Sequence, residues 1–125
     1  MSTIPSMLAG LLLLILAPAP PADRSRWDAV PVAAHARSNP LAQDAQAVPA
    51  GEILYRNYCR HCHGEDARGD GKKKPSLRSS EVRGASDGDL EWFLRQGDLR
   101  NGMPSWSSLP RAQRWQIIAY LRSLP

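Results

Sequence analysis

Residues 59–63 read Cys-Arg-His-Cys-His, two cysteines three positions apart followed directly by a histidine. This C-x-x-C-H pattern is typical of covalent haem attachment, because each thiol can add across one vinyl group of the porphyrin. The histidine is then held beside the ring and can ligate the iron from one side. The pattern predicts that Cys59 and Cys62 attach one haem c, that His63 is an axial iron ligand, and that the fold encloses a large flat cofactor.

The same cysteine spacing also occurs in redox disulfides and in zinc sites. A thioredoxin-like disulfide requires a strand and a βαβ context, and no period-2 strand pattern is present. A structural zinc site normally takes four ligands from two separated pairs, whereas Cys59 and Cys62 are the only cysteines of the chain. Haem attachment is therefore favoured, with His61 as a solvent-facing spacer because it cannot share the direction of Cys62 and His63.

The N-terminal 22 residues carry no charged side chain, and residues 7–17 form an unbroken apolar run of 11 residues. A membrane span needs about 20 apolar residues, whereas this run has the length of the apolar region of a secretory signal. We therefore expect residues 1–22 to be a signal peptide or an N-terminal anchor, with residues 7–17 as a membrane tether if they are kept. The expected location is periplasmic, either soluble or tethered.

The remaining chain divides into an arm and one domain. Residues 23–48 are rich in Ala and Pro and have no sustained apolar period, which predicts a flexible linker. From residue 49 on, apolar positions follow helical spacing, so residues 49–125 are expected to form a single domain. A domain of this size buries little surface alone, and a covalent haem would complete its core.

Three helices are expected in this domain. In the first, Gly51, Leu54, Tyr55, Tyr58 and Cys62 share one face, which places the cysteine motif at the C-terminal end of the helix. A glycine inside a helix costs about 1 kcal/mol relative to alanine, so Gly51 favours a close crossing with another backbone.

The second and third helices are marked by their ends. Ser86 and Asp89 resemble a capping box, and Gly97 is a natural C-terminal stop. The last helix is expected to start near Pro110, a residue favoured in a first turn, and to run to the end of the domain. The sequence thus predicts an all-α fold of three or more helices and ordered loops around the haem.

A second axial ligand must come from elsewhere, and the candidates are His35, Met103, Met1 and Met7. Met1 and Met7 belong to the export segment, and nothing in the sequence fixes His35. Met103 lies 40 residues beyond His63, between Gly102 and Pro104, in a turn-rich loop on no helical stripe. We therefore expect His63 and Met103 to ligate the iron, a pairing that raises the reduction potential.

These residues together resemble the class I cytochrome c family in its short bacterial form, over residues 49–125. A glycine eight residues and an aromatic four residues before the first cysteine are typical of that family, and Gly51 and Tyr55 stand there. The resemblance implies that an aromatic of the last helix packs at this glycine, and Tyr120 is the matching residue.

Two loops carry the rest of the resemblance. The family has a Pro-x-Leu after its glycine-rich loop, matched by Pro75 and Leu77. It implies that the Pro75 carbonyl accepts a hydrogen bond from His63 and that Leu77 packs on the haem. The family's Gly-Met-Pro followed by an aromatic is matched by residues 102–104 and Trp106.

The functional expectation is a single-haem electron-transfer protein that is not an enzyme. Residues 49–125 carry 13 basic and 9 acidic side chains, a net charge of +4, and residues 72–74 are three lysines. Redox proteins with acidic docking patches are therefore the expected partners, without nucleic acid, for a monomer or a subunit of a redox complex. The alternatives are a cytochrome c subunit of a larger membrane oxidase or periplasmic dehydrogenase and, less favoured, a haem sensor or peroxidase-like enzyme.

Overall fold

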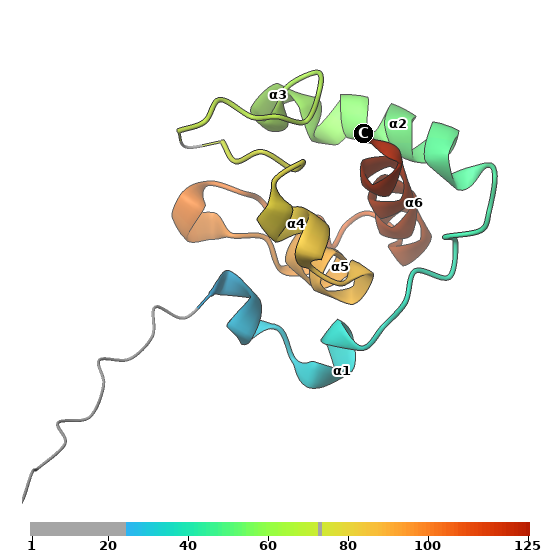
Figure 1. Cartoon of the computed structure of the whole chain (residues 1–125), viewed down its shortest axis with the longest axis horizontal. Coiled ribbons are helices and arrows are strands. Elements are labelled where there is room, and N and C mark those ends of the chain that lie inside the picture. Colours follow the sequence, from blue (N-terminus) through green and yellow to red (C-terminus); the bar gives the residue numbers. More distant parts are fainter. Residues whose placement is uncertain (1–24, 73) are drawn as a thin grey trace, which may run out of the picture.

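The computed structural model describes residues 25–72 and 74–125, which form helices and loops without a strand (Figure 1). The elements in chain order are η1 (Arg26–Ala29), α1 (Val32–His35), α2 (Ala47–Tyr58), α3 (Arg60–His63), α4 (Ser80–Gly84), α5 (Asp87–Gln96), η2 (Leu99–Asn101) and α6 (Arg111–Ser123). The expected all-α fold is confirmed. Within the described part of the chain, no helix has the length and apolar character needed to cross a membrane.

Helices α2 and α6 cross in direct contact (Figure 1). A Cβ atom on Gly51 would collide with the carbonyl oxygen of Gln116 and would lie 2.9 Å from the Cβ of Tyr120. The rings of Tyr55 and Tyr120 pack beside this crossing with centroids 5.4 Å apart. The close crossing predicted from Gly51 is thus present, with Tyr120 at the position that the family resemblance implied.

Helix α5 has the ends that its sequence predicts. The Ser86 hydroxyl accepts a hydrogen bond from the Asp89 N–H, and the Asp89 carboxylate accepts one from the Ser86 N–H, which completes a capping box. Gly97 follows the last helical residue with a φ of 70°, in the left-handed region that favours glycine. Both ends are set by neighbours in sequence, so their positions are fixed locally.

A buried ion pair joins α5 to α6. Glu91 is fully buried and Arg114 is 5% exposed. The guanidinium donates to one carboxylate oxygen of Glu91 from Nε at 3.0 Å and from Nη2 at 2.9 Å. Because a buried charge is costly unless it is paired, this contact fixes how the two helices sit against each other.

The first helix differs from the expectation in one respect. The sequence predicts one continuous helix through the cysteine motif, but α2 ends at Tyr58 and Cys59 caps it, so the motif forms a separate turn, α3. Cys59 keeps right-handed helical backbone angles, and its N–H donates to the Tyr55 carbonyl, so α3 follows α2 directly after a local break.

The segment before α2 is not the flexible linker that its composition predicts. His35 pairs with Asp89 at 2.8 Å, and the side-chain amide of Asn39 donates to the Trp115 carbonyl at 2.9 Å. A Cβ on Gly88 would collide with the carbonyl oxygen of Ala34, so α1 lies directly against α5. These contacts join residues 54 to 76 positions apart, which explains why no local pattern predicted them. Residues 1–24, including the expected signal or anchor, lie outside the described residues.

Candidate haem site

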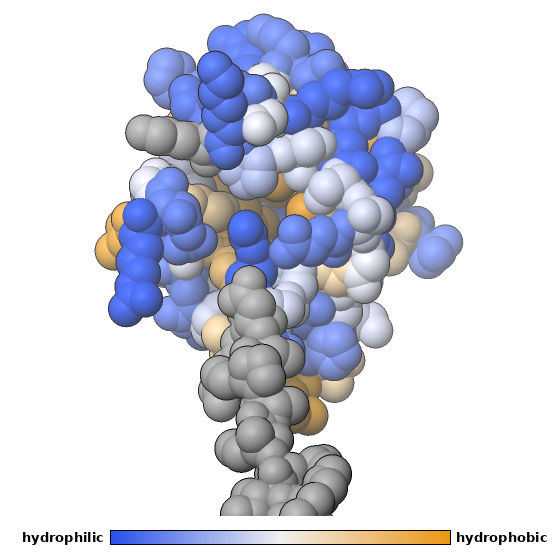
Figure 2. Space-filling model, turned by 60° about the vertical axis from the view of Figure 1, so that its left-hand side comes forward, coloured by the Kyte–Doolittle hydropathy of each residue, from blue (hydrophilic) through white to orange (hydrophobic). Residues whose placement is uncertain are grey.

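A cavity of about 860 Å³ opens between the cysteine motif, α5 and the loops that precede α4 and α6. This volume lies within the roughly 300–1,000 Å³ typical of sites for organic ligands. All six predicted site residues line this cavity: Cys59, Cys62, His63, Pro75, Leu77 and Met103. Other residues of the wall are mostly apolar and include Tyr58, Leu90, Phe93, Leu94, Trp106, Ile117 and Leu121. Figure 2 shows apolar surface inside a hollow bordered by hydrophilic side chains.

The two cysteines lie at the cavity wall as free thiols, Cys59 buried and Cys62 exposed. Burial, followed by the neighbouring Cys62, raises the pKa of the Cys59 thiol to about 12. Redox-active cysteines instead have a lowered pKa, because the thiolate is their reactive form. The raised pKa of Cys59 is opposite to the shift that a reactive redox thiol needs, and both thiols line the cavity.

The ring of His63 is oriented by a backbone carbonyl. Its Nδ1 lies 3.0 Å from the Pro75 oxygen, and with the proton on Nδ1 the ring donates to this carbonyl. A histidine that donates one ring N–H in this way presents the other nitrogen, Nε2, as a metal ligand of fixed orientation. The geometry that the family resemblance implied for His63 and Pro75 is present.

The glycine-rich loop holds the Pro75 carbonyl in place. Gly69 has a φ of 64°, and a Cβ there would lie 2.7 Å from the Pro75 oxygen. The Asp70 carboxylate accepts hydrogen bonds from the N–H groups of Lys72 at 2.8 Å and Lys74 at 3.0 Å. These two bonds lower the pKa of Asp70, because they stabilise the carboxylate. The Asp70 carboxylate thus stabilises the conformation of the exposed loop that follows His63.

Met103 lies in the segment between α5 and α6, where a pair of backbone hydrogen bonds holds it. Its N–H donates to the Asp98 carbonyl and its own carbonyl accepts from the Asp98 N–H, each at 2.9 Å. Gly97 and Gly102, with φ of 70° and 81°, permit the turns on either side. Met103 is partly buried and lines the cavity, so its thioether sulfur, a soft donor suited to haem iron, belongs to the same site as His63.

The other candidate ligands lie elsewhere. His35 pairs with Asp89 on α1 and α5 and does not line the cavity. His61 is exposed and also stays outside the lining, which agrees with a spacer role. Met1 and Met7 lie outside the described residues.

Among the lining residues that sequence reasoning did not assign to the site, two come from the arm before the domain. Arg26 and Trp27 of η1 line the cavity, although the arm that carries them was expected to be flexible. A single turn of 3-10 helix is too short to show periodicity, so the only local signals that the arm packs on the domain were the side chains of Trp27 and His35.

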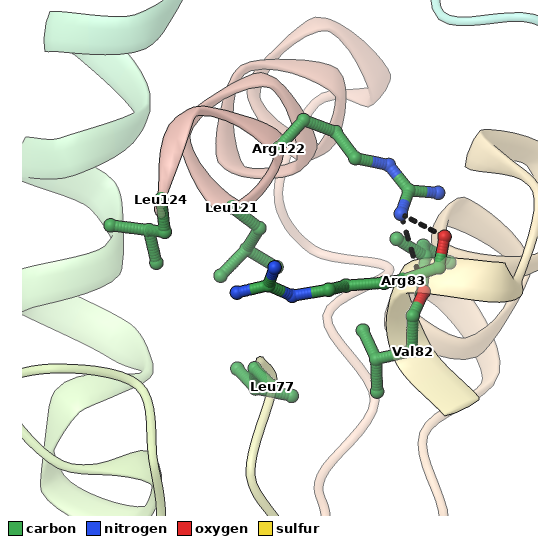
Figure 3. A pocket seen from close by; sticks show the side chains of 7 residues that line it. Leu77, Val82, Arg83, Leu121, Arg122 and Leu124 are labelled. Atoms are coloured by element: carbon green, nitrogen blue, oxygen red, sulfur yellow. Dashed lines mark hydrogen bonds between the residues drawn. The ribbon is translucent and has the colours of Figure 1, made fainter. Parts of the chain in front are cut away.

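A second, smaller cavity of about 170 Å³ adjoins the first and shares the side chains of Leu77, Val82, Leu90 and Leu121 with it. Figure 3 shows Arg122 beside it, donating to the carbonyls of Val82 and Arg83 at 3.2 Å each. Those carbonyls lie in the last turn of α4, where backbone acceptors lack a full set of helical partners, although the Val82 carbonyl also accepts from the Ala85 N–H at 3.3 Å. Arg122 therefore ties α6 to α4 behind the wall that carries Leu77.

The cavity mouth is more basic than acidic. Among its described lining residues, Arg26, Lys72, Lys74 and Arg100 are basic and two, Glu81 and Asp98, are acidic. A rim of this sign attracts negatively charged surfaces at long range.

Helices that cross at a glycine, an attachment motif and a cavity with a histidine and a methionine define a c-type cytochrome domain with covalently bound haem c. Residues 46–121 match the family described as cytochrome c oxidase, cbb3-type, subunit III. The chain belongs to this family, and its domain is an electron-transfer domain.

Two known proteins are similar to this chain in sequence. It is 34% identical over 107 residues to the cbb3-type cytochrome c oxidase subunit CcoP of Rubrivivax gelatinosus, a match that covers 82% of this chain and 35% of that subunit. The crystal structure of cytochrome CL from the marine methylotroph Methylophaga aminisulfidivorans matches with a TM-score of 0.59 and 30% identity, over 69% of this chain and 60% of that one. The chain thus spans about a third of the length of the curated relative and less than two thirds of the solved structure.

Proposed function

We propose that the chain is a single-haem electron carrier that acts outside the cytoplasm and passes electrons between redox proteins. When bound, the haem iron supplies a one-electron couple between Fe(III) and Fe(II). The protein's residues hold, orient and enclose that group: Cys59 and Cys62 attach it, and His63 and Met103 ligate the iron. Because His63 and Met103 would both hold the iron, the site would carry electrons rather than act on a substrate, and the chain would not be an enzyme.

The observation that carries this proposal is the shared cavity of His63 and Met103. Each is held by backbone contacts of its own loop, His63 through the Pro75 carbonyl and Met103 through Asp98. Ligands that are fixed before the iron changes its oxidation state need little rearrangement during transfer. The apolar walls exclude water, which supports a high potential together with the His/Met pairing.

The charge around the cavity mouth supports a proposal about the redox partners of the protein. Four basic and two acidic lining residues favour redox proteins with acidic patches, which would dock transiently over a small interface. Residues 1–22 are proposed as a signal peptide or a tether that delivers the domain to the periplasmic side.

A second candidate function is a cytochrome c subunit of a larger oxidase complex. The match to a protein named as a cbb3-type oxidase subunit favours it, and the same domain would then serve as an electron inlet. Co-purification with a partner complex in high salt would support the subunit. Binding that weakens steeply with salt would support the free carrier, because exposed charge contacts are screened.

Visible spectra of the oxidised and reduced protein, with intact mass, test the proposal. We expect one covalent haem, a thioether-ligated ferric spectrum, and slow or no binding of carbon monoxide by the reduced protein at neutral pH. Rapid carbon monoxide binding to the native protein would show an open sixth position and would instead support a sensor or peroxidase-like role.

A further inference from the structure

Residues 25–45 lie outside the part of the chain that matches the family, which starts at residue 46, yet two of them, Arg26 and Trp27, reach the haem cavity. We infer that Trp27 is a wall residue of the haem site and that this N-terminal segment, here called the strap, helps set the reduction potential. The inference rests on the proposed haem site and extends it to a residue that the family match does not include.

Trp27 is held in the wall by two different contacts. Its indole N–H donates to the Glu81 carboxylate at 3.0 Å, and its ring packs edge-on against Phe93 with centroids 5.0 Å apart at 76°. Both Glu81 and Phe93 line the cavity. Arg26 adds an ion pair to the same Glu81 oxygen at 3.3 Å, so one carboxylate receives two neighbouring side chains of the strap.

The rest of the strap anchors this turn to the domain. The Ser86 hydroxyl donates to the His35 carbonyl at 2.7 Å, and the Asn39 amide donates to the Trp115 carbonyl at 2.9 Å. Asn39 is 6% exposed and Ala34 is 4% exposed, so the strap is attached to the domain at a few buried positions while most of its other residues are exposed. Trp27 is consequently positioned by the fold and not only by its own two contacts.

A large apolar side chain in the wall has an electrostatic consequence. The Fe(III) form carries one more positive charge than the Fe(II) form, and water stabilises the more highly charged form. The apolar shell around a redox site controls solvent access and hence the potential. Removing the indole should therefore admit water, favour Fe(III) and lower the potential.

The chain offers a matched control. Trp92 packs edge-on against the same Phe93, with centroids 5.1 Å apart at 84°, but it does not line the cavity. Trp92→Ala removes an equal ring from the same aromatic partner without opening the haem wall.

The experiment is a redox titration of the full holoprotein as wild type, Trp27→Ala, Trp27→Phe and Trp92→Ala. We expect Trp27→Ala to shift the Fe(III)/Fe(II) equilibrium toward Fe(III) at least threefold, where tenfold corresponds to about 59 mV for one electron. Trp27→Phe, which keeps an apolar ring, should recover most of the wild-type value, and Trp92→Ala should leave it unchanged.

An unchanged potential in Trp27→Ala, or equal shifts in Trp27→Ala and Trp92→Ala, would overturn the inference. The second result would mean that Phe93 alone transmits the effect. Visible spectra of each variant separate this outcome from a failure of the proposed function. A wild-type His/Met spectrum with an unchanged potential refutes the wall role of Trp27 only, whereas a protein without haem refutes the site itself.

Discussion

Arg114 places two guanidinium nitrogens within 3.0 Å of one carboxylate oxygen of Glu91 in the interior, while the second carboxylate oxygen has no protein partner among the described residues. The Arg114 guanidinium also donates to the Leu109 carbonyl, so the pair joins α5 to the loop before α6 as well as to α6. Since Leu94 of α5 and Ile117 of α6 both line the cavity, this ion pair controls the distance between two of its walls.

Breaking the ion pair from one side should be costly. Arg114→Met leaves the buried Glu91 without its two close hydrogen bonds and with only the more distant Arg111 beside it, and we expect a loss of about 3–5 kcal/mol in the free energy of unfolding. Arg111→Met is the control, because Arg111 is 3.9 Å from the same carboxylate but is half exposed, and exposed pairs contribute about 0–1 kcal/mol. Urea unfolding of the holoprotein measures both, and equal losses in the two variants would contradict the special role of Arg114.

The crossing of α2 and α6 should not tolerate a methyl group. Gly51→Ala puts a Cβ against the Gln116 carbonyl, and overpacking of this kind costs about 1–3 kcal/mol or more. Gly84→Ala in α4 meets nothing within 4 Å and should be neutral or slightly stabilising, because alanine favours helix by about 1 kcal/mol. If thermal unfolding showed Gly51→Ala to be more stable than Gly84→Ala, the close contact of α2 and α6 at Gly51 would be contradicted.

Met103 is the residue on which the proposed ligation depends. Met103→Ala should shift the iron toward Fe(III) by at least tenfold, which is about 59 mV for one electron, and should open the reduced protein to carbon monoxide. Leu99→Ala is a control from the same loop, since Leu99 is 78% exposed and does not line the cavity. Redox titration that finds Met103→Ala equal to wild type would assign the sixth ligand elsewhere.

Loss of an attachment thiol should reduce the yield of folded protein. Cys59→Ala or Cys62→Ala removes one thioether, and a domain this small depends on the haem to fill its core. His61→Ala, between the two cysteines and exposed, should give normal holoprotein. Haem content per chain after purification measures this, and a stable apo-domain from Cys59→Ala in normal yield would show that the core is sufficient without haem.

Asp70 should make the His63 loop sensitive to acid. Its pKa is lowered in the folded state by the N–H groups of Lys72 and Lys74, so its carboxylate contributes stability above the unfolded pKa of about 3.9. That contribution is lost as the pH falls through the lower, folded pKa. In an acid titration followed by the haem spectrum, Asp70→Asn should lack this part of the pH dependence. Glu52→Gln, which removes a carboxylate paired with the Arg56 side chain, should retain it.

The sequence predicted best what is determined by near neighbours. The capping box of Ser86 and Asp89 and the glycine at position 97 gave α5 its bounds, and Gly51 alone indicated the helix crossing. The site loops were recognisable because their glycines and prolines restrict the backbone. Trp27 was missed for the opposite reason, since its partners Glu81 and Phe93 lie more than 50 residues away and a single helical turn has no period.

The crossing at Gly51 also orders events during maturation. Helix α6 is synthesised after every other described element, and α2 cannot pack until α6 is present to contact it. Cys59, which caps α2, and Cys62 in α3 are therefore made before the helix that completes the crossing. Because a domain of this size needs the haem to complete its core, we expect both thiols to stay accessible until the haem is attached and the crossing of α2 and α6 at Gly51 to close afterwards.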